Sequence, residues 1–200
     1  MPKTVEKNIK REENFLFLRQ LVKNPKMLGA IVPSSEALGK FISKQIVITD
    51  QTQCVEIGAG TGSLTLALLR AGILPENLYV VELDTTLSDF LKKKLPAEVH
   101  VIKGDAAHLE KLLPSHIIGH VDTVVSGIPM MNLSKAEQTA LIESSFNVMK
   151  NEGSLLQFTY GPLSPLPAKK LGLSKKRIGH VLLNFPPATI WRYQRSSIAQ

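Results

Sequence analysis

The segment of this sequence best suited to ligand binding is VEIGAGTGS, residues 55–63, where a short apolar run meets a helical pattern. Glycine at every second position lets the backbone turn sharply and approach a ligand closely. Glu56 stands two residues before the first glycine, and Ser63 stands where a dinucleotide-binding loop has its third glycine. A carboxylate here repels a pyrophosphate but attracts a cation. The segment therefore favours S-adenosylmethionine, which carries sulfonium and ammonium groups, over a nucleotide phosphate.

Two further carboxylates follow the next two apolar runs of the chain. Glu82 ends the run LYVVEL and lies 20 residues after Gly62, the spacing at which an acidic side chain reaches ribose hydroxyls. Asp105, in KGDAA after the run VHVI, is placed to accept a hydrogen bond from an adenine amino group or from the adjoining backbone. Each carboxylate alone could be a solvated loop residue, but three on successive strand ends predict one binding site.

The segment VVSGIPM, residues 124–130, offers groups that could orient a substrate amine beside a methyl donor. Ser126 and the neighbouring carbonyls are hydrogen-bond acceptors, and Pro129 rigidifies the turn. Tyr160 follows the next apolar run and combines an aromatic ring with a polar hydroxyl. An ordinary strand-ending turn and a tyrosine of the core are the alternatives at these two places.

If the group that accepts the methyl of such a donor is an amine, it must be neutral. An amine that titrates like lysine costs about 4–5 kcal/mol to deprotonate at pH 7, and nearby carboxylates increase that cost. We therefore assign no general base. We expect positioning, which can supply roughly 7–11 kcal/mol, to provide much of the acceleration.

The elements that must position these residues follow from the alternation of apolar runs and helical patterns between residues 53 and 160. Such alternation predicts βαβ units and a parallel sheet covered on both faces. After the proline-rich loop GPLSPLP, the runs HVLLNF and ATIWRYQ predict a closing antiparallel pair. The predicted fold class is α/β and Rossmann-like, with a mostly parallel sheet, a C-terminal antiparallel strand pair and an N-terminal amphipathic helix.

The N-terminal helix is predicted over residues 5–24 and ends at Asn24-Pro25. Its apolar side chains gather on one half of the helical wheel. Packing on the core of the domain and lying on an anionic lipid surface are both open interpretations. We divide the chain into residues 1–30, a basic amphipathic helix for membrane docking or a lid, and residues 31–200, the methyltransferase domain.

The basic charge of the chain is concentrated at its two ends. The chain has 200 residues and a formal net charge of +7, with 44% hydrophobic and 20% charged residues, which describes one compact domain. Residues 1–26 hold seven Lys and Arg against three Glu, residues 27–160 hold ten against fourteen acids, and residues 161–200 hold seven against none. An acidic middle between basic ends suits a cationic ligand and an anionic partner surface.

Several function classes are excluded by composition. The single cysteine, Cys54, excludes a disulfide framework and a Cys-rich metal site. The five histidines show no metal-ligand spacing, so we expect no metal. No apolar run reaches about 18 residues, and residues 1–26 lack the features of a signal peptide. We therefore expect a cytoplasmic protein.

Seven segments carry a resemblance to the bacterial phospholipid N-methyltransferases, a family of the class I S-adenosylmethionine-dependent methyltransferases, and they span almost the whole chain. The glycine loop is common to many methyltransferases, whereas the PSS, SGIP and FTYGP segments in this order are more specific. The resemblance implies a Rossmann-like methyltransferase fold and stepwise methylation of phosphatidylethanolamine toward phosphatidylcholine. The segments are NPKMLGAIVPSS (24–35), VEIGAGTGSLTLALL (55–69), VVELD (80–84), GDAA (104–107), VVSGIPM (124–130), QFTYGPLSP (157–165) and KRIGHVLLNFPPATIWRY (176–193).

The resemblance and the residue chemistry together define the expected site. The expected cofactor-binding residues are Glu56, Gly58, Ala59, Gly60, Gly62, Glu82, Leu83, Asp105, Ala106 and Ser126. The expected catalytic residues are Ser126, Gly127, Pro129 and Tyr160, and the expected lipid-binding residues are Tyr160, Lys169 and Arg177. Basic residues near a membrane surface contribute about 1 kcal/mol each, and a guanidinium can bind two phosphate oxygens at once. We expect peripheral association with the inner face of the cell membrane, a phospholipid substrate and an anionic membrane surface as partner.

Two rival readings remain. The stronger is an enzyme that resembles the rRNA adenine dimethylases, since the sequence pI is about 9.5. That family has an aromatic residue after the motif proline to stack on a flipped base, whereas Met130 and Met131 follow Pro129 here. The other rival is a noncatalytic lipid-surface module, against which the intact glycine loop argues. We therefore do not expect nucleic acid as a partner.

Overall fold

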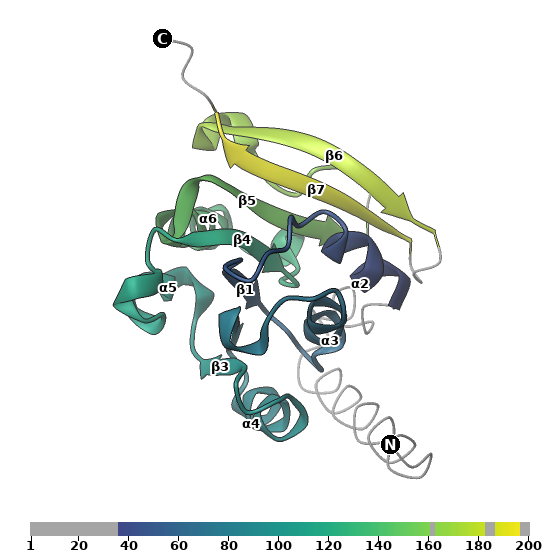
Figure 1. The fold of residues 1–200 in the computed structure, drawn as a ribbon. Coiled ribbons are helices and arrows are strands. Elements are labelled where there is room, and N and C mark those ends of the chain that lie inside the picture. The colour runs from purple at the N-terminus through teal and green to yellow at the C-terminus, as the bar shows by residue number, and fades with distance from the viewer. Residues whose placement is uncertain (1–35, 161–162, 183–186, 197–200) are drawn as a thin grey trace.

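The computed structural model describes residues 36–160, 163–182 and 187–196, and a seven-stranded sheet forms its centre (Figure 1). The strand order is β3-β2-β1-β4-β5-β7-β6. β1 pairs in parallel with both β2 and β4, so the order reverses between β1 and β4, where open α/β sheets bind ligands. The strands are β1 (Cys54–Ile57), β2 (Leu78–Glu82), β3 (His100–Lys103), β4 (Val121–Ser126), β5 (Met149–Thr159), β6 (Leu173–Val181) and β7 (Ala188–Arg195).

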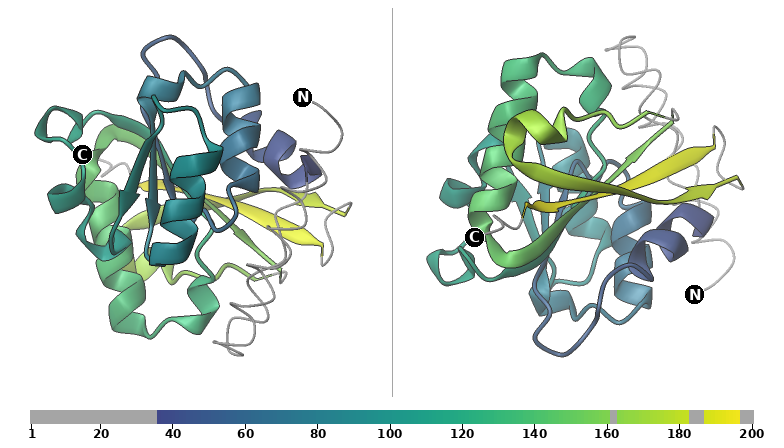
Figure 2. Two further views of the ribbon diagram at one scale, coloured as in Figure 1. Left: turned by 90° about the horizontal axis from the view of Figure 1, so that it is seen from below. Right: turned by 90° about the horizontal axis from the view of Figure 1, so that it is seen from above.

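Helices cover both faces of the sheet, as the two views in Figure 2 show. One apolar cluster lies between the sheet and α2 (Glu36–Ser43), α3 (Ser63–Arg70) and α4 (Thr85–Lys94). The other lies between the sheet and α5 (Leu109–Leu112) and α6 (Lys135–Val148). Short 3-10 turns complete the connections: η2 (Pro75–Asn77), η3 (Ala106–His108), η4 (Ser115–Ile117), η5 (Met130–Asn132) and η6 (Ala168–Leu171).

The direction of the strands places six of their carboxyl ends at one edge. β1 to β5 are parallel, and β7 is antiparallel to both β5 and β6. β6 therefore runs in the same direction as the five parallel strands, and its arrowhead lies on the right-hand side of Figure 1. We call the edge formed by the ends of β1 to β6 the carboxyl edge.

The expected fold class is confirmed, including the C-terminal antiparallel pair. The first strand of that pair begins at Leu173 rather than at His180, and it contains the basic run Lys175–Arg177. These side chains are exposed because β6 is the last strand of the sheet, where charges also oppose pairing with another chain. The expected N-terminal helix and the 1–30 segment lie outside the described residues. Within the described ranges, no helix is long and apolar enough to cross a membrane.

Candidate active site

All three glycines of the loop after β1 adopt left-handed conformations that other residues rarely reach. The φ angle is 70° at Gly58, 58° at Gly60 and 78° at Gly62. A Cβ at Gly58 would lie 2.6 Å from the Ile128 side chain, and one at Gly62 would lie 2.7 Å from Leu91. At Gly60 a Cβ would meet no atom within 4 Å. Two glycines thus pack the loop against its neighbours, while Gly60 borders open space where a ligand is expected.

The turn after β4 touches the glycine loop through main-chain atoms. The Gly127 N–H donates to the carbonyl of Ile57 at 2.8 Å. A Cβ at Gly127 would lie 2.4 Å from the carbonyl oxygen of Gly58, so only glycine fits. Pro129 follows at the start of η5. The structure therefore brings the expected catalytic turn into direct contact with the expected cofactor loop.

Glu56 has a buried carboxyl group that no described residue hydrogen-bonds. The residue is 1% exposed, and both carboxyl oxygens lack a partner. Burial raises the pKa of Glu56 to about 7, and the negative charge of Glu82 raises it further. The polar groups of nearby Thr65 lower this pKa, although the Thr65 hydroxyl does not have the geometry of a hydrogen bond. An unpartnered buried carboxyl is costly, and a cationic ligand group would supply the missing partner. The carboxyl therefore fits the cationic groups of S-adenosylmethionine.

Glu82, at the end of β2, ties the second strand to the glycine loop. Its carboxylate accepts hydrogen bonds from the N–H of Gly60 at 2.9 Å and of Asp84 at 3.0 Å. Burial raises the pKa of Glu82, and these backbone hydrogen bonds lower it. Each oxygen keeps a further lone pair that can accept a ribose hydroxyl. Beside it Leu83 is 67% exposed and Ala59 is half-buried, so apolar surface borders the acidic group.

Asp105 lies at the end of the neighbouring strand, β3. The Gly104 N–H donates to the main-chain carbonyl of Glu82 at 3.1 Å, which joins the two strand ends. The exposed carboxylate of Asp105 accepts from the N–H of Ala107 at 2.9 Å and so begins the 3-10 turn, in which Ala106 is buried. The three expected carboxylates therefore stand at the ends of three adjacent strands.

Ser126 is fully buried at the end of β4, and its hydroxyl is engaged within the turn. The Ser126 Oγ accepts from the N–H of Ile128 at 3.3 Å. The carbonyl of Ile128 accepts from the side-chain amide of Gln157 at 3.0 Å and from the N–H of Met130 at 2.9 Å. Of the carbonyls expected to face a substrate amine, the one at Ile128 is therefore engaged by the protein itself.

Gln157, on β5, was not predicted from the sequence as a site residue. It is 1% exposed, its Nε2 also donates to the carbonyl of Phe158 at 2.8 Å, and its Oε1 has no partner among the described residues. Strand register places Ser126, Gln157, Trp191 and Arg177 in one row across β4, β5, β7 and β6. The Trp191 Nε1 is likewise buried without a described partner. In the sequence, Gln157 could have been recognised only as the one amide within the apolar run LLQFT, residues 155–159.

The three expected lipid-binding residues are not gathered in one place. Tyr160 is half-buried, and its ring meets Phe158 edge-on at 5.9 Å on the α2–α4 side of the sheet. Arg177 is exposed on β6, level with Gln157. Lys169 is exposed in η6, before the amino end of β6 and thus at the edge opposite the glycine loop. The structure does not bring Lys169 to the carboxyl edge, because the chain crosses the sheet before β6 begins.

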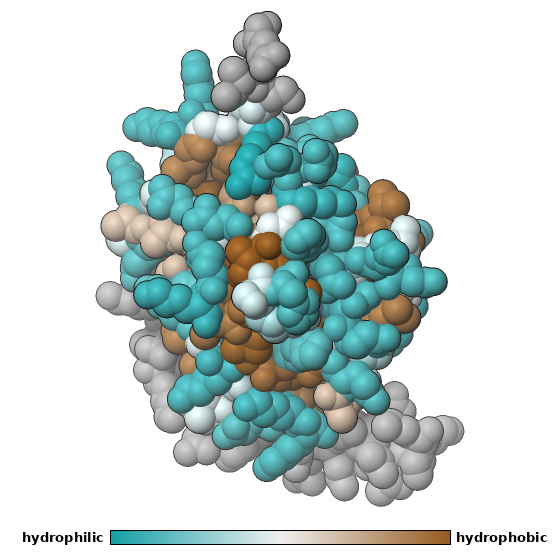
Figure 3. All heavy atoms as spheres, turned by 60° about the vertical axis from the view of Figure 1, so that its left-hand side comes forward, coloured by the Kyte–Doolittle hydropathy of each residue, from teal (hydrophilic) through white to brown (hydrophobic). Residues whose placement is uncertain are grey.

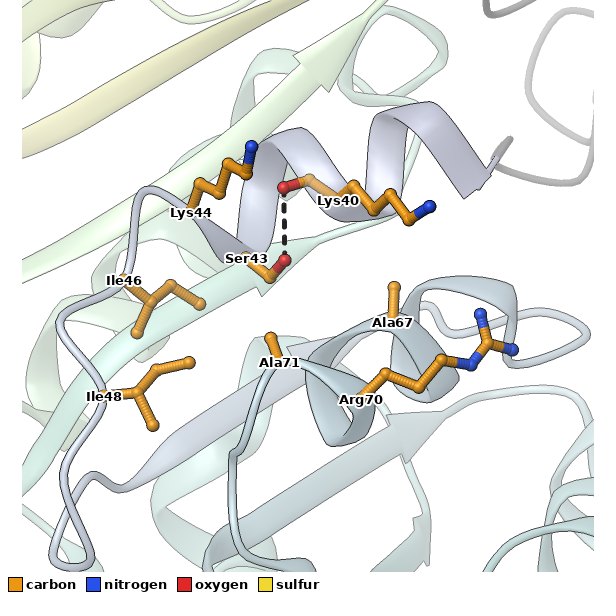
Figure 4. A pocket seen from close by; sticks show the side chains of 8 residues that line it. All are labelled: Lys40, Ser43, Lys44, Ile46, Ile48, Ala67, Arg70 and Ala71. Carbon is orange, nitrogen blue, oxygen red and sulfur yellow. Dashed lines mark hydrogen bonds between the residues drawn. The ribbon is translucent and has the colours of Figure 1, made fainter.

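A cavity of about 570 Å³ lies between α2, α3 and the segment after α2 (Figure 4). Ile46 and Ile48 point into it, while Lys40, Lys44 and Arg70 carry the charges of its rim. These cations stand in or beside the last turns of two helices, where the helix dipole already favours positive charge. That placement accounts for them without a ligand, so we assign none to this cavity. Among the described residues, no three His, Cys, Asp or Glu side chains are grouped to hold a metal ion.

An unpartnered buried carboxyl beside an open glycine loop, at the point where a parallel sheet reverses its order, suits a cationic cofactor. The class of protein that this fold and site define is the S-adenosylmethionine-dependent methyltransferases. Residues 54–153, half of the chain, match the family described as "Methyltransferase domain". The chain belongs to this family, and S-adenosylmethionine is its methyl donor.

Similar proteins differ in what their names say they act on. The ornithine lipid N-methyltransferase of Singulisphaera acidiphila is 29% identical over 151 residues, which cover 74% of this chain and 78% of that protein. The probable ribosomal RNA small subunit methyltransferase A of Pyrobaculum islandicum is 27% identical over 106 residues, which cover 53% of this chain and 43% of that protein. TrmN from Thermus thermophilus matches with a TM-score of 0.63 at 14% identity, covering 86% of this chain and 52% of that chain, and shows the fold alone. The chain thus spans about half the length of the last two proteins.

Proposed function

We propose that this methyltransferase acts on the headgroup amine of phosphatidylethanolamine and of its methylated intermediates, toward phosphatidylcholine. The ordered PSS, SGIP and FTYGP segments support this substrate class. The name of the lipid N-methyltransferase that is 29% identical supports a lipid amine as the acceptor.

The observation that favours a lipid over a nucleobase as the substrate concerns Met130 and Met131, the two residues after Pro129. An enzyme that methylates a flipped base needs a flat side chain to stack on it. Met130 is 1% exposed and packs in the core below α6, whereas Met131 is 68% exposed. Neither residue offers an aromatic face, and the exposed one presents a flexible apolar side chain that suits a lipid.

In the proposed mechanism, residues of β1–β3 hold the cofactor and the turn after β4 orients the acceptor. Bound S-adenosylmethionine supplies a methyl group made electrophilic by the positive sulfur. Glu56 would partner a cationic group, Gly60 would admit close approach of the backbone, and Glu82 would accept ribose hydroxyls. Leu83 and Asp105 would flank the adenine.

The turn at residues 126–129 is held from two sides, which fixes the main chain that faces the acceptor amine. The Gly127 N–H anchors it to β1, and the Gln157 amide anchors it to β5. We assign Ser126 a positioning role in this turn, because its hydroxyl is buried and accepts from Ile128. Acceleration then comes mainly from alignment, with roughly 7–11 kcal/mol available from that source, and the amine enters the site neutral.

We further propose that the enzyme works at the inner face of the cell membrane as a peripheral protein. Tyr160 and Arg177 are the proposed headgroup contacts on the described chain. The basic residues 1–30, which lie outside the described residues, would add electrostatic attraction to anionic lipids. Deleting residues 1–24 is expected to weaken vesicle sedimentation more in low salt than in high salt, because salt screens exposed charges. Equal loss at both salt concentrations would count against electrostatic docking.

The substrate is tested with purified full-length protein and methyl-labelled S-adenosylmethionine. One arm receives anionic vesicles containing phosphatidylethanolamine, and the other receives ribosomal RNA. We expect label in lipid, resolved by chromatography into mono-, di- and trimethylated products. Label in RNA with none in lipid would overturn the proposed substrate and favour the rRNA alternative.

A further inference from the structure

Four exposed apolar side chains follow strands that end at the carboxyl edge. Leu83 comes directly after β2, Met131 lies in η5 after β4, Leu163 lies four residues after β5, and Leu182 comes directly after β6. Their exposed fractions are 67%, 68%, 75% and 78%, in that order. One further large apolar side chain, Val47, is 84% exposed in the segment before β1.

Exposed apolar side chains do not by themselves indicate a binding surface, because folded proteins normally expose scattered apolar atoms. Figure 3 brings the left-hand side of Figure 1 forward, away from the carboxyl edge, and apolar side chains lie among hydrophilic ones on that face too. What distinguishes the carboxyl edge is that three strands in succession, β4, β5 and β6, are each followed by a large, mostly exposed apolar side chain.

The two halves of this edge differ in charge. Glu82, Asp84 and Asp105 stand at the ends of β2 and β3, where Leu83 belongs to the proposed cofactor site. The other half is flanked by β6, on which exposed Arg177 lies level with Ser126 at the end of β4 and five residues before Leu182. Lys175 and Lys176, also exposed, precede Arg177 on the same strand. Apolar side chains at an edge whose flanking strand carries cations are a combination that suits an anionic lipid surface.

The segment that carries Leu163 is anchored to the sheet. The hydroxyl of the next residue, Ser164, is hydrogen-bonded to the hydroxyl of Tyr193 at 2.8 Å, and Tyr193 is fully buried on β7. Ser164 also donates to the carbonyl of Leu166. Leu163 is therefore an exposed side chain next to a residue that is hydrogen-bonded to the sheet.

We propose that Met131, Leu163 and Leu182 form an apolar rim that docks on the leaflet of an anionic bilayer. Docking there would turn the carboxyl edge toward the lipid headgroups, so that an amine could reach the turn at Ser126 without the lipid leaving the membrane. The proposal rests on the proposed function in one respect, that the substrate is a membrane lipid.

The test measures cosedimentation of the full chain with phosphatidylcholine vesicles that contain phosphatidylglycerol and no amine lipid. The variants are Leu182→Ser and Met131→Ser, with Val47→Ser as the matched control because Val47 is at least as exposed and lies elsewhere. Removing one inserted side chain is expected to weaken vesicle binding about tenfold. The control is expected to bind as the wild type does. Equal behaviour of Leu182→Ser and Val47→Ser, whether both bind normally or both bind weakly, would overturn the proposal.

A second measurement reports insertion without relying on affinity. The single cysteine, Cys54, is fully buried, so an environment-sensitive dye should label a Cys introduced by Leu182→Cys or Val47→Cys. We expect the emission of the dye at position 182 to shift to shorter wavelength when vesicles are added, and the dye at position 47 to remain unchanged. Docking on lipid would be contradicted if the emission of the dye at position 182 did not change when vesicles were added. It would also be contradicted if the same shift arose without vesicles, through self-association of the protein.

Failure of the docking surface can be told apart from failure of the proposed substrate. Methyl transfer to a water-soluble short-chain phosphatidylethanolamine needs no membrane, so Leu182→Ser should retain the wild-type rate there. If vesicle binding depends on Leu182 but no methyl group is transferred to any amine lipid, the rim is supported and the proposed substrate is wrong. If methyl groups are transferred to lipid but vesicle binding does not depend on Leu182, the proposed substrate is supported and the rim is wrong.

Discussion

The β1–β3 half and the β4–β6 half of the carboxyl edge meet at the contact between Gly58 and Gly127, yet they are built from different chemistry. The first half buries two carboxylates, Glu56 and Glu82, and leaves open space at Gly60. The second half fixes its turn through hydrogen bonds from the N–H of Ile128 and the amide of Gln157, and it exposes apolar tips such as Leu182. A soluble cationic cofactor requires buried, preorganised polar atoms, whereas the proposed lipid acceptor would require an apolar approach.

The largest expected effect is on cofactor affinity in the β1–β3 half. A pair of glycine variants distinguishes the loss of space for the ligand from the cost of backbone strain. Gly60 and Gly172 have φ angles of 58° and 65°, and a Cβ at either position would meet no atom within 4 Å. Gly60→Ala and Gly172→Ala should therefore cost a similar amount of stability, about 1 kcal/mol. Only Gly60→Ala should fill the cofactor cradle, so we expect its S-adenosylmethionine affinity to fall by about 100-fold or more in calorimetry. Equal cofactor affinity in the two variants would place the cofactor elsewhere.

The next prediction concerns the unpartnered carboxyl of Glu56. Glu56→Gln removes the anion, and loss of a charge-assisted interaction is expected to weaken cofactor binding about 30-fold. A cationic ligand favours the ionised form of a group whose pKa is about 7 in the free protein. Wild-type affinity should therefore rise about tenfold from pH 6 to pH 8 relative to the variant. A difference that is independent of pH would contradict direct partnership with this carboxyl.

The same variant should change stability in the opposite sense. The pKa of Glu56 is raised from 4.5 to about 7 by folding, so the folded protein holds a proton that the unfolded chain has released between these pH values. The free energy of unfolding must then fall as pH rises through that window, by about 3 kcal/mol relative to the Gln variant. Denaturant unfolding of both cofactor-free proteins at pH 4.5 and pH 8 measures this difference. Parallel pH profiles would show that the carboxyl is not buried as described.

A smaller effect is expected from Gln157, which holds the turn in the second half. Gln157→Leu removes the amide that donates to the carbonyls of Ile128 and Phe158. We expect kcat to fall about tenfold while cofactor affinity stays within about twofold, because the cofactor half is untouched. Gln138→Leu is the control, since Gln138 also donates two hydrogen bonds, to Met130 and Leu133 beyond the turn. A similar loss of kcat in both variants would reduce Gln157 to a structural role.

The smallest predicted effect compares two cations at different edges. Arg177→Gln should raise the KM for vesicle lipid about fivefold, equivalent to about 1 kcal/mol for one charge at a membrane. Lys169→Gln removes the same charge from η6, at the opposite edge, and should leave the KM unchanged. An equal rise for both would mean that net charge matters and position does not.

Local patterns in the sequence were sufficient to predict the strands and helices of the parallel part of the sheet and the turn geometry of the glycine loop. The alternation of short apolar runs with helical patterns predicts β1 to β5 and the helices between them, because each signal spans only a few neighbouring residues. The left-handed glycines of the loop could be predicted in the same way, since turn geometry is a property of one short segment. The cofactor role of Glu56 stays a prediction from its charge and its place before that loop.

The substrate half depended on information that local patterns do not contain. The row from Ser126 through Gln157 and Trp191 to Arg177 exists only after four strands pair in a particular register. Lys169 seemed close to the site along the chain, but the path of residues 163–171 across the sheet places it at the far edge. The apolar rim likewise consists of residues that are unremarkable singly and are related only by strand direction.

The most direct test of the division is a two-by-two measurement on Gly60→Ala and Leu182→Ser, in which cofactor affinity and binding to anionic vesicles are both determined for each variant. We expect Gly60→Ala to lose cofactor affinity and keep vesicle binding, whereas Leu182→Ser should keep cofactor affinity and lose about tenfold in vesicle binding. Loss of both properties in either variant, or a change in neither for Leu182→Ser, would contradict the separation of the cofactor and lipid halves.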